Sequence, residues 1–156
     1  MKAAHPAGRQ LERKTDMLKS KLLHPTILGV LGASGHGSAV LMADGNYPFN
    51  TGANPAAERV FLNLMPGVLG VPDVLQAIVT AIPIEAAHVM IPDDGSEPPI
   101  FREFRGLLPG LSLETHERFA FYDLAKQPNV SLVIATGEQR VYANLLLVIG
   151  VVPPPG

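Results

Sequence analysis

The sequence predicts a single α/β domain whose central sheet is covered on both faces. Segments with the character of strands alternate along the chain with segments that have a helical period. Several of the expected strands are apolar without interruption, which is typical of strands that are buried on both faces. A chain of 156 residues is long enough for one domain with one sizeable hydrophobic core.

The composition favours a cytoplasmic protein that associates with another protein or with copies of itself. Charged residues make up 17% of the chain, fewer than in an average soluble domain, which leaves room for apolar surface patches. The net charge of −2 gives no electrostatic footprint for nucleic acid. The sequence contains no apolar run long enough to span a membrane, no secretory signal and no cysteine for disulfides or thiolate chemistry.

The first residues carry charges, Gly and Pro without an apolar period. We therefore expect residues 1–16 to form a flexible arm in front of a domain at 17–156. The apolar spacing from Leu18 to Leu31 predicts a helix with Pro25 near its first turn and Gly32 as its stop.

The remaining elements are predicted from short apolar runs and from turn and cap residues. A buried strand is expected at 39–43, and a loop rich in Gly, Asn and Pro is expected at 46–58. The other expected strands are 60–64, 86–91, 111–113, 130–135 and 144–152, and the other expected helices are 74–82, 98–108 and one capped by Thr115 that contains 119–125.

Polar residues flank the buried strand at 39–43. His36 lies between Gly35 and Gly37, which have no side chains to keep a ligand away from the ring, and Asp44 follows the strand. This layout suits chemistry on a small polar ligand, although a structural or exposed histidine and an Asp-Gly turn are the more common explanation of such a pattern.

Two further polar clusters lie near the ends of expected elements. Thr115 to Arg118 stand at an expected helix start, and Thr136 to Glu138 with Tyr142 to Asn144 precede the last strand. Asp, Asn, Tyr and Arg side chains suit a hydroxyl-bearing ligand, but cap and turn chemistry is the alternative for each cluster. No phosphate-binding loop or hydrolase elbow is present. The five histidines lack metal-ligand spacing on one helix face, so we expect no metal site; they are His5, His24, His36, His88 and His116.

These motifs stand in the order and approximate spacing of the L-fucose mutarotase and D-ribose pyranase family. The chain resembles this family from about Leu18 to Val152. The resemblance implies a cytoplasmic sugar mutarotase with a three-layer α/β/α sandwich around a mixed sheet, no cofactor, no metal, and ring-shaped homo-oligomers that are often decamers. The matching motifs are Gly35-His36-Gly37, Asp44-x-x-x-Pro48, Arg118-Phe119-Ala120-Phe121-Tyr122 and, most specifically, Thr136-Gly137-Glu138-x-x-x-Tyr142-Ala143-Asn144.

The resemblance also implies roles for individual residues. His36 matches the family's acid/base, and Asp44 matches its sugar-binding aspartate. Arg118 matches an arginine of the fucose branch, whereas His116 falls where the ribose branch has a binding histidine. The family's binding run before the last strand is matched by Tyr142, Ala143 and Asn144.

One position departs from the family pattern. Both branches commonly have Asp two residues after the histidine, where this chain has Ser38. Without that charged partner for the imidazole, activity is expected to be weaker or to depend differently on pH.

Mutarotation requires a base that removes the proton of the anomeric hydroxyl and an acid that protonates the ring oxygen. The ring then opens, the C1–C2 bond rotates, and the ring closes again. An imidazole can perform either step near neutral pH, so His36 is the expected acid/base and Tyr142 the expected second proton carrier. The remaining sugar hydroxyls would be held by Asp44, Asn144 and Arg118.

The spacing of His36 and Asp44 leads to a prediction about assembly. Extended chain advances about 3.3 Å per residue, so the two residues would lie roughly 20–26 Å apart in one chain. A monosaccharide is much shorter. We therefore predict that His36 of one subunit completes a pocket formed by Asp44, Tyr142 and Asn144 of its neighbour, in a homo-oligomer whose sites lie at subunit interfaces.

Other functions remain open at this point. A D-ribose pyranase is favoured by His116, and a non-catalytic monosaccharide-binding protein is favoured by Ser38. A purely structural role for the polar motifs, as turns and caps, is the third possibility.

Overall fold

The computed structural model describes residues 18–156, so the expected arm at 1–16 and Met17 lie outside the described residues. Within this range the strands form one six-stranded sheet in the order β2-β5-β1-β6-β3-β4. The sheet is mixed, because β6 runs antiparallel to β1 and β3 while the other pairs are parallel. In chain order the elements are α1 (Pro25–Ala33), β1 (Ala39–Ala43), β2 (Glu58–Phe61), α2 (Val71–Ile78), β3 (Ile84–Met90), α3 (Phe101–Leu107), β4 (Leu113–His116), α4 (Arg118–Ala125), β5 (Val130–Ala135) and β6 (Leu145–Ile149).

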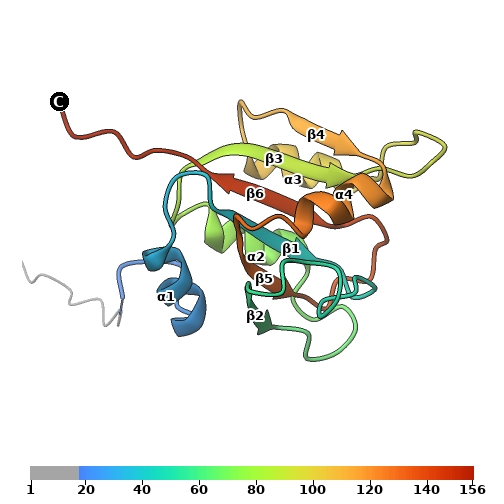
Figure 1. Cartoon of the computed structure of the whole chain (residues 1–156), viewed down its shortest axis with the longest axis horizontal. Helices are drawn as coiled ribbons and strands as arrows, with labels where there is room; N and C mark the ends of the chain where they lie inside the picture. The colour runs from blue at the N-terminus through green and yellow to red at the C-terminus, as the bar shows by residue number, and fades with distance from the viewer. Residues whose placement is uncertain (1–17) are drawn as a thin grey trace, which may run out of the picture.

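The helices are divided unequally between the two faces of the sheet. The helices α1, α2 and α3 contribute to one core, which includes Val40 and Met42 of β1. On the opposite face α4 packs through Phe121 over Leu41 and Leu146. In Figure 1, α4 lies in front of the sheet, and α2 and α3 lie behind it. The predicted three-layer α/β/α sandwich is therefore confirmed.

The strand β1 lies between β5 and β6, and all five of its residues are buried. Its side chains alternate between the two cores, so neither face of the strand meets water. This explains why β1 is apolar without interruption, and why polar groups occur only beyond its ends. The polar groups that precede and follow β1 therefore lie at opposite ends of the strand.

Two helix starts differ from the prediction. The helix α1 begins at Pro25 rather than at Leu18, because a residue in front of proline is disfavoured in helical conformation. The helix α4 is capped by Glu117 and not by Thr115, since Thr115 lies in β4 and pairs with β3. The Glu117 carboxylate accepts the N–H groups of the first turn instead.

Most other boundaries shift by a few residues. The strands β1 and β5 have the predicted bounds, because their burial on both faces leaves a purely apolar signal. The ends of the remaining elements differ from the predicted ends, because helix capping and strand pairing decide where each element stops. The observed bounds are β2 at 58–61, α2 at 71–78, β3 at 84–90, α3 at 101–107, β4 at 113–116 and β6 at 145–149.

Among residues 18–156, no helix has the length and apolar character needed to cross a membrane.

Candidate active site

A buried polar corner lies where β1 ends and β6 begins. Asp44 follows β1 and Asn144 precedes β6, and the antiparallel pairing of these strands brings the two residues together. The Asp44 N–H donates to Asn144 Oδ1 at 2.8 Å, and Asp44 Oδ2 accepts the Ala143 N–H at 3.2 Å. The residues are only 2% and 3% exposed respectively. Their geometry is therefore fixed by backbone contacts before any ligand arrives.

This corner opens into a cleft of about 210 Å³. Four of the predicted site residues line it, namely Asp44, Arg118, Tyr142 and Asn144. The volume is smaller than the ~300–1,000 Å³ of pockets for drug-sized molecules, which suits a ligand of monosaccharide size. The other lining residues are Asn46, Tyr47, Met90, Tyr122 and Val141.

Tyr142 and Arg118 meet across the cleft from distant parts of the chain. Tyr142 has a left-handed backbone with φ 57°, a conformation that typically costs about 1–3 kcal/mol for a residue other than glycine. Tyr142 directly precedes Ala143, whose N–H donates to the Asp44 carboxylate. Arg118 is the first residue of α4, and the neighbouring Tyr142 side chain is the main cause that raises the pKa of its guanidinium.

The electrostatics of Asp44 reflect a balance between burial and hydrogen bonding. Burial raises the pKa of its carboxyl group above the usual range, and bonds from the Asn46 and Ala143 N–H groups oppose that rise only in part. A buried carboxylate with oriented lone pairs is a strong acceptor for hydroxyl groups. Asp44 is therefore suited to hold a sugar by its hydroxyls.

The run Thr136 to Glu138 supports this corner and does not line the cleft. Thr136 Oγ1 donates to the Ala43 carbonyl at 2.8 Å, and the Gly45 N–H donates to the Glu138 carbonyl at 2.8 Å. A Cβ on Gly137 would lie 2.3 Å from the Val68 carbonyl oxygen, so only glycine fits at this position. The run thus fixes the turn that follows β1.

His36 lies at the opposite end of β1, away from this cleft. It lines a separate cavity of about 340 Å³ beside the end of β6, and its side chain is 58% exposed. The five residues of β1, at about 3.3 Å each, separate His36 from Asp44 by roughly 16 Å or more. The described chain therefore does not bring His36 together with the other predicted site residues.

A carboxylate that the sequence reasoning missed contacts His36. Glu85 Oε2 lies 2.8 Å from His36 Nε2. The pairing register between β3 and β6 shifts around Glu85, between Ile84 and Ala86. Ser38 Oγ instead accepts the Gly35 N–H at 3.3 Å and closes the turn. No local pattern marks Glu85 as a partner of a residue 49 positions earlier.

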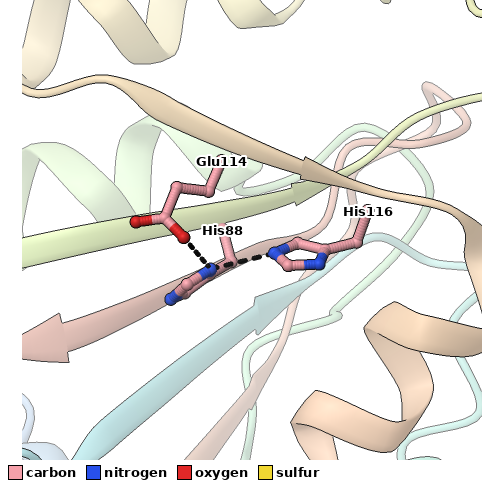
Figure 2. Close-up of side chains that lie close together, drawn as sticks. All are labelled: His88, Glu114 and His116. Carbon is pink, nitrogen blue, oxygen red and sulfur yellow. Dashed lines mark hydrogen bonds and ion pairs between the residues drawn. The ribbon is translucent and has the colours of Figure 1, made fainter.

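His116 also lies outside the cleft. It is the last residue of β4, and its Nε2 lies 3.0 Å from Nδ1 of His88 on β3. Glu114 Oε2 lies 3.3 Å from the same His88 nitrogen, and Figure 2 shows the three side chains converging. Burial lowers the pKa of His88. His116 does not line the cleft that contains Asp44 and Asn144, so the structure does not bring it together with the other residues predicted to bind the sugar.

A comparison with protein families assigns the chain. Residues 17–152 match the model of the RbsD / FucU transport protein family. The chain belongs to this family. The fucose mutarotase of Danio rerio is 34% identical over 85% of this chain and 92% of its own length. The human fucose mutarotase is 31% identical over 83% of this chain and 90% of its own.

Solved structures share the three-layer fold of this chain. The fucose mutarotase from Streptococcus pneumoniae, in complex with L-fucose, is 27% identical with a TM-score of 0.71, covering 83% of this chain and 94% of that one. RbsD from Bacillus subtilis, complexed with D-ribose, has a TM-score of 0.76 over 88% of this chain and 100% of that one. At 23% identity this second likeness supports the fold alone.

Proposed function

We infer that this protein is a sugar mutarotase, an isomerase that interconverts the anomers of a monosaccharide, with L-fucose as the first candidate substrate. The observation that carries this is the buried corner of Asp44 and Asn144 in a cleft that Tyr142 and Arg118 also line. Fucose mutarotases of about one-third identity match most of the chain.

In this proposal the cleft holds the sugar through its hydroxyl groups. The Asp44 carboxylate accepts hydroxyl protons, and the Arg118 guanidinium donates from the entrance of the cleft. Asn144 Oδ1 is occupied by the Asp44 N–H, which leaves its NH₂ group to donate to the ligand. Tyr142 offers an apolar ring face and a hydroxyl that can carry one of the two protons.

His36, the acid/base of the reaction, comes from a neighbouring subunit. It is exposed at the far end of β1, so it can reach the cleft of another copy but not that of its own chain. Exposed apolar side chains that suit contacts between copies include Phe61, Leu64 and Met65. The decameric ring and the cytoplasmic location that the family resemblance implies remain part of this proposal.

Glu85 is proposed as the residue that orients the His36 ring. A carboxylate hydrogen-bonded to one ring nitrogen fixes the tautomer and leaves the other nitrogen free for proton transfer. Ser38 cannot provide that charge, and its hydroxyl contacts the Gly35 N–H. Glu85 thus takes the part that an aspartate at position 38 would play.

The substrate is tested by magnetisation-transfer NMR, which measures exchange between anomers at equilibrium. We expect the chain to accelerate exchange of L-fucose more than that of D-ribose, and His36→Ala to abolish the effect. Greater acceleration for ribose would favour a ribose pyranase. Binding of either sugar without acceleration between pH 6 and 8 would favour a binding protein instead.

The shared site is tested by mixing two inactive chains, His36→Ala and Asp44→Ala, after dissociation and reassembly. If His36 and Asp44 act across an interface, about a quarter of the pockets in an equal random mixture contain both intact residues. A mixture of either variant with the double variant is the control and should stay inactive. Absence of recovery in rings of confirmed mixed composition would contradict the shared site.

A further inference from the structure

We propose that His88, Glu114 and His116 form a binding site for a divalent transition-metal ion, with Zn²⁺ as the best fit. Three potential ligand atoms of these residues all lie within 4.8 Å of one another. They converge from the neighbouring strands β3 and β4, as Figure 2 shows. The site is separate from the proposed sugar chemistry and does not depend on it.

The spacing of the ligand atoms fits a small tetrahedral ion. His88 Nδ1 lies 3.0 Å from His116 Nε2 and 3.3 Å from Glu114 Oε2. Zinc bonds of about 2.0–2.1 Å in tetrahedral geometry separate two ligand atoms by about 3.3 Å. Two edges of the ligand triangle therefore already have nearly the length that the ion requires.

The backbone fixes this arrangement. His88 and Glu114 are register partners in the parallel β3–β4 pair, and His116 follows Glu114 by two residues. Side chains two positions apart on a strand project from the same face, so all three point the same way. Because the ligands come from two strands, they do not show the spacing along one helix that a metal site in a helix would have. An ion here would also link the edge strand β4 to the sheet.

Hydrogen bonding alone satisfies these three groups poorly. A single neutral ring nitrogen carries at most one proton, yet His88 Nδ1 faces both the carboxylate and the His116 nitrogen. With the proton on His88 Nδ1, one hydrogen has to serve two acceptors, and with Nδ1 unprotonated its lone pair faces the Glu114 carboxylate. A cation placed among the three atoms would accept a lone pair from each of them.

The ligand types indicate which ion fits. Two imidazoles and one carboxylate match the preferences of Zn²⁺, whereas Ca²⁺ and Mg²⁺ prefer sites built from oxygen atoms. Three protein ligands leave a fourth position for water or another small ligand. The Glu114 side chain is 56% exposed, so the ion can enter and that position can face solvent.

The test is metal binding by the full chain after chelation and dialysis. Zn²⁺ is titrated by calorimetry, and Co²⁺ is used as a spectroscopic probe, because a four-coordinate Co²⁺ ion absorbs visible light far more strongly than the hydrated ion. We expect a site that His88→Ala and His116→Ala each weaken at least about 10-fold. Glu114→Gln, at an exposed side chain, serves as the variant least able to disturb folding.

Glu58→Gln is the matched control, since Glu58 is an exposed carboxylate on β2, the opposite edge strand of the sheet. This control should bind Zn²⁺ and Co²⁺ as the unaltered chain does. The proposal is overturned if Co²⁺ keeps the spectrum of the hydrated ion, or if the three ligand variants bind as tightly as the control. Neither result bears on sugar exchange, so failure here is distinguishable from failure of the mutarotase function.

Discussion

Replacement of Glu85 by Gln should slow mutarotation by a small factor and lower the free energy of unfolding by no more than about 1 kcal/mol. The pair joins His36 Nε2 and Glu85 Oε2 at 2.8 Å, with side chains that are 58% and 44% exposed. A polar contact this exposed contributes at most about 0.2–1 kcal/mol. Since about 1.36 kcal/mol of activation free energy corresponds to tenfold in rate, kcat/KM should fall by about 1.4–5-fold.

The assay compares anomer exchange of L-fucose by magnetisation-transfer NMR with thermal unfolding of the same samples. Glu97→Gln is the matched control, because Glu97 forms a similarly exposed ion pair with Arg105, distant in sequence from His36, and should leave exchange unchanged. Ser38→Asp in the Glu85→Gln chain should restore the rate, since it returns a carboxylate close to the ring. An unaltered rate in Glu85→Gln, with His36→Ala inactive, would refute the orienting role.

Three other expectations concern the supports of the site. Gly137→Ala should lower the free energy of unfolding by about 1–3 kcal/mol, because the added Cβ clashes with the backbone. Gly106→Ala is the control and should not destabilise α3, because a Cβ there meets nothing within 4 Å. Urea denaturation of both variants measures the difference. Arg140 lowers the pKa of Glu138, so this pair stabilises the fold above the ordinary glutamate range and loses that contribution as pH falls through the folded pKa. The acid-induced loss of stability in chemical denaturation should therefore be smaller in Glu138→Gln. Tyr142→Phe should reduce anomer exchange by about 10²-fold or more, with less effect on sugar affinity measured by calorimetry.

The agreement between sequence and fold depends on how directly burial determines residue type. The bounds of β1 and β5 were predicted correctly because strands buried on both faces permit only apolar residues. The start of α1 was wrong because the apolar period continues in front of Pro25, where the proline itself prevents helix. The predicted cap of α4 was wrong because Thr115 lies in β4, where its backbone pairs with β3. Competing backbone partners of this kind have no local signature.

The residues of the site likewise fall into those that a local motif identifies and those that depend on pairing between distant segments. Arg118, Tyr142 and Asn144 were identified by motif, and they line the same cleft as Asp44. Glu85 escaped notice because its contact with His36 depends on the pairing of segments far apart in the sequence. The partners of His88 were not foreseen for the same reason, since they lie on the adjacent strand β4. Both contacts are fixed by strand register, which periodicity does not reveal.

The position of β1 explains why we expect a complete site to require two chains. A strand buried on both faces cannot bend to bring its two ends together without exposing apolar side chains and breaking pairing with β5 and β6. His36 and Asp44 are attached to the two ends of this strand. The same burial that makes the strand easy to predict thus holds the proposed proton carrier apart from the proposed sugar site. An assembly that places one end of β1 against the opposite end in a neighbour resolves this separation, and the mixing of His36→Ala with Asp44→Ala chains tests that arrangement directly.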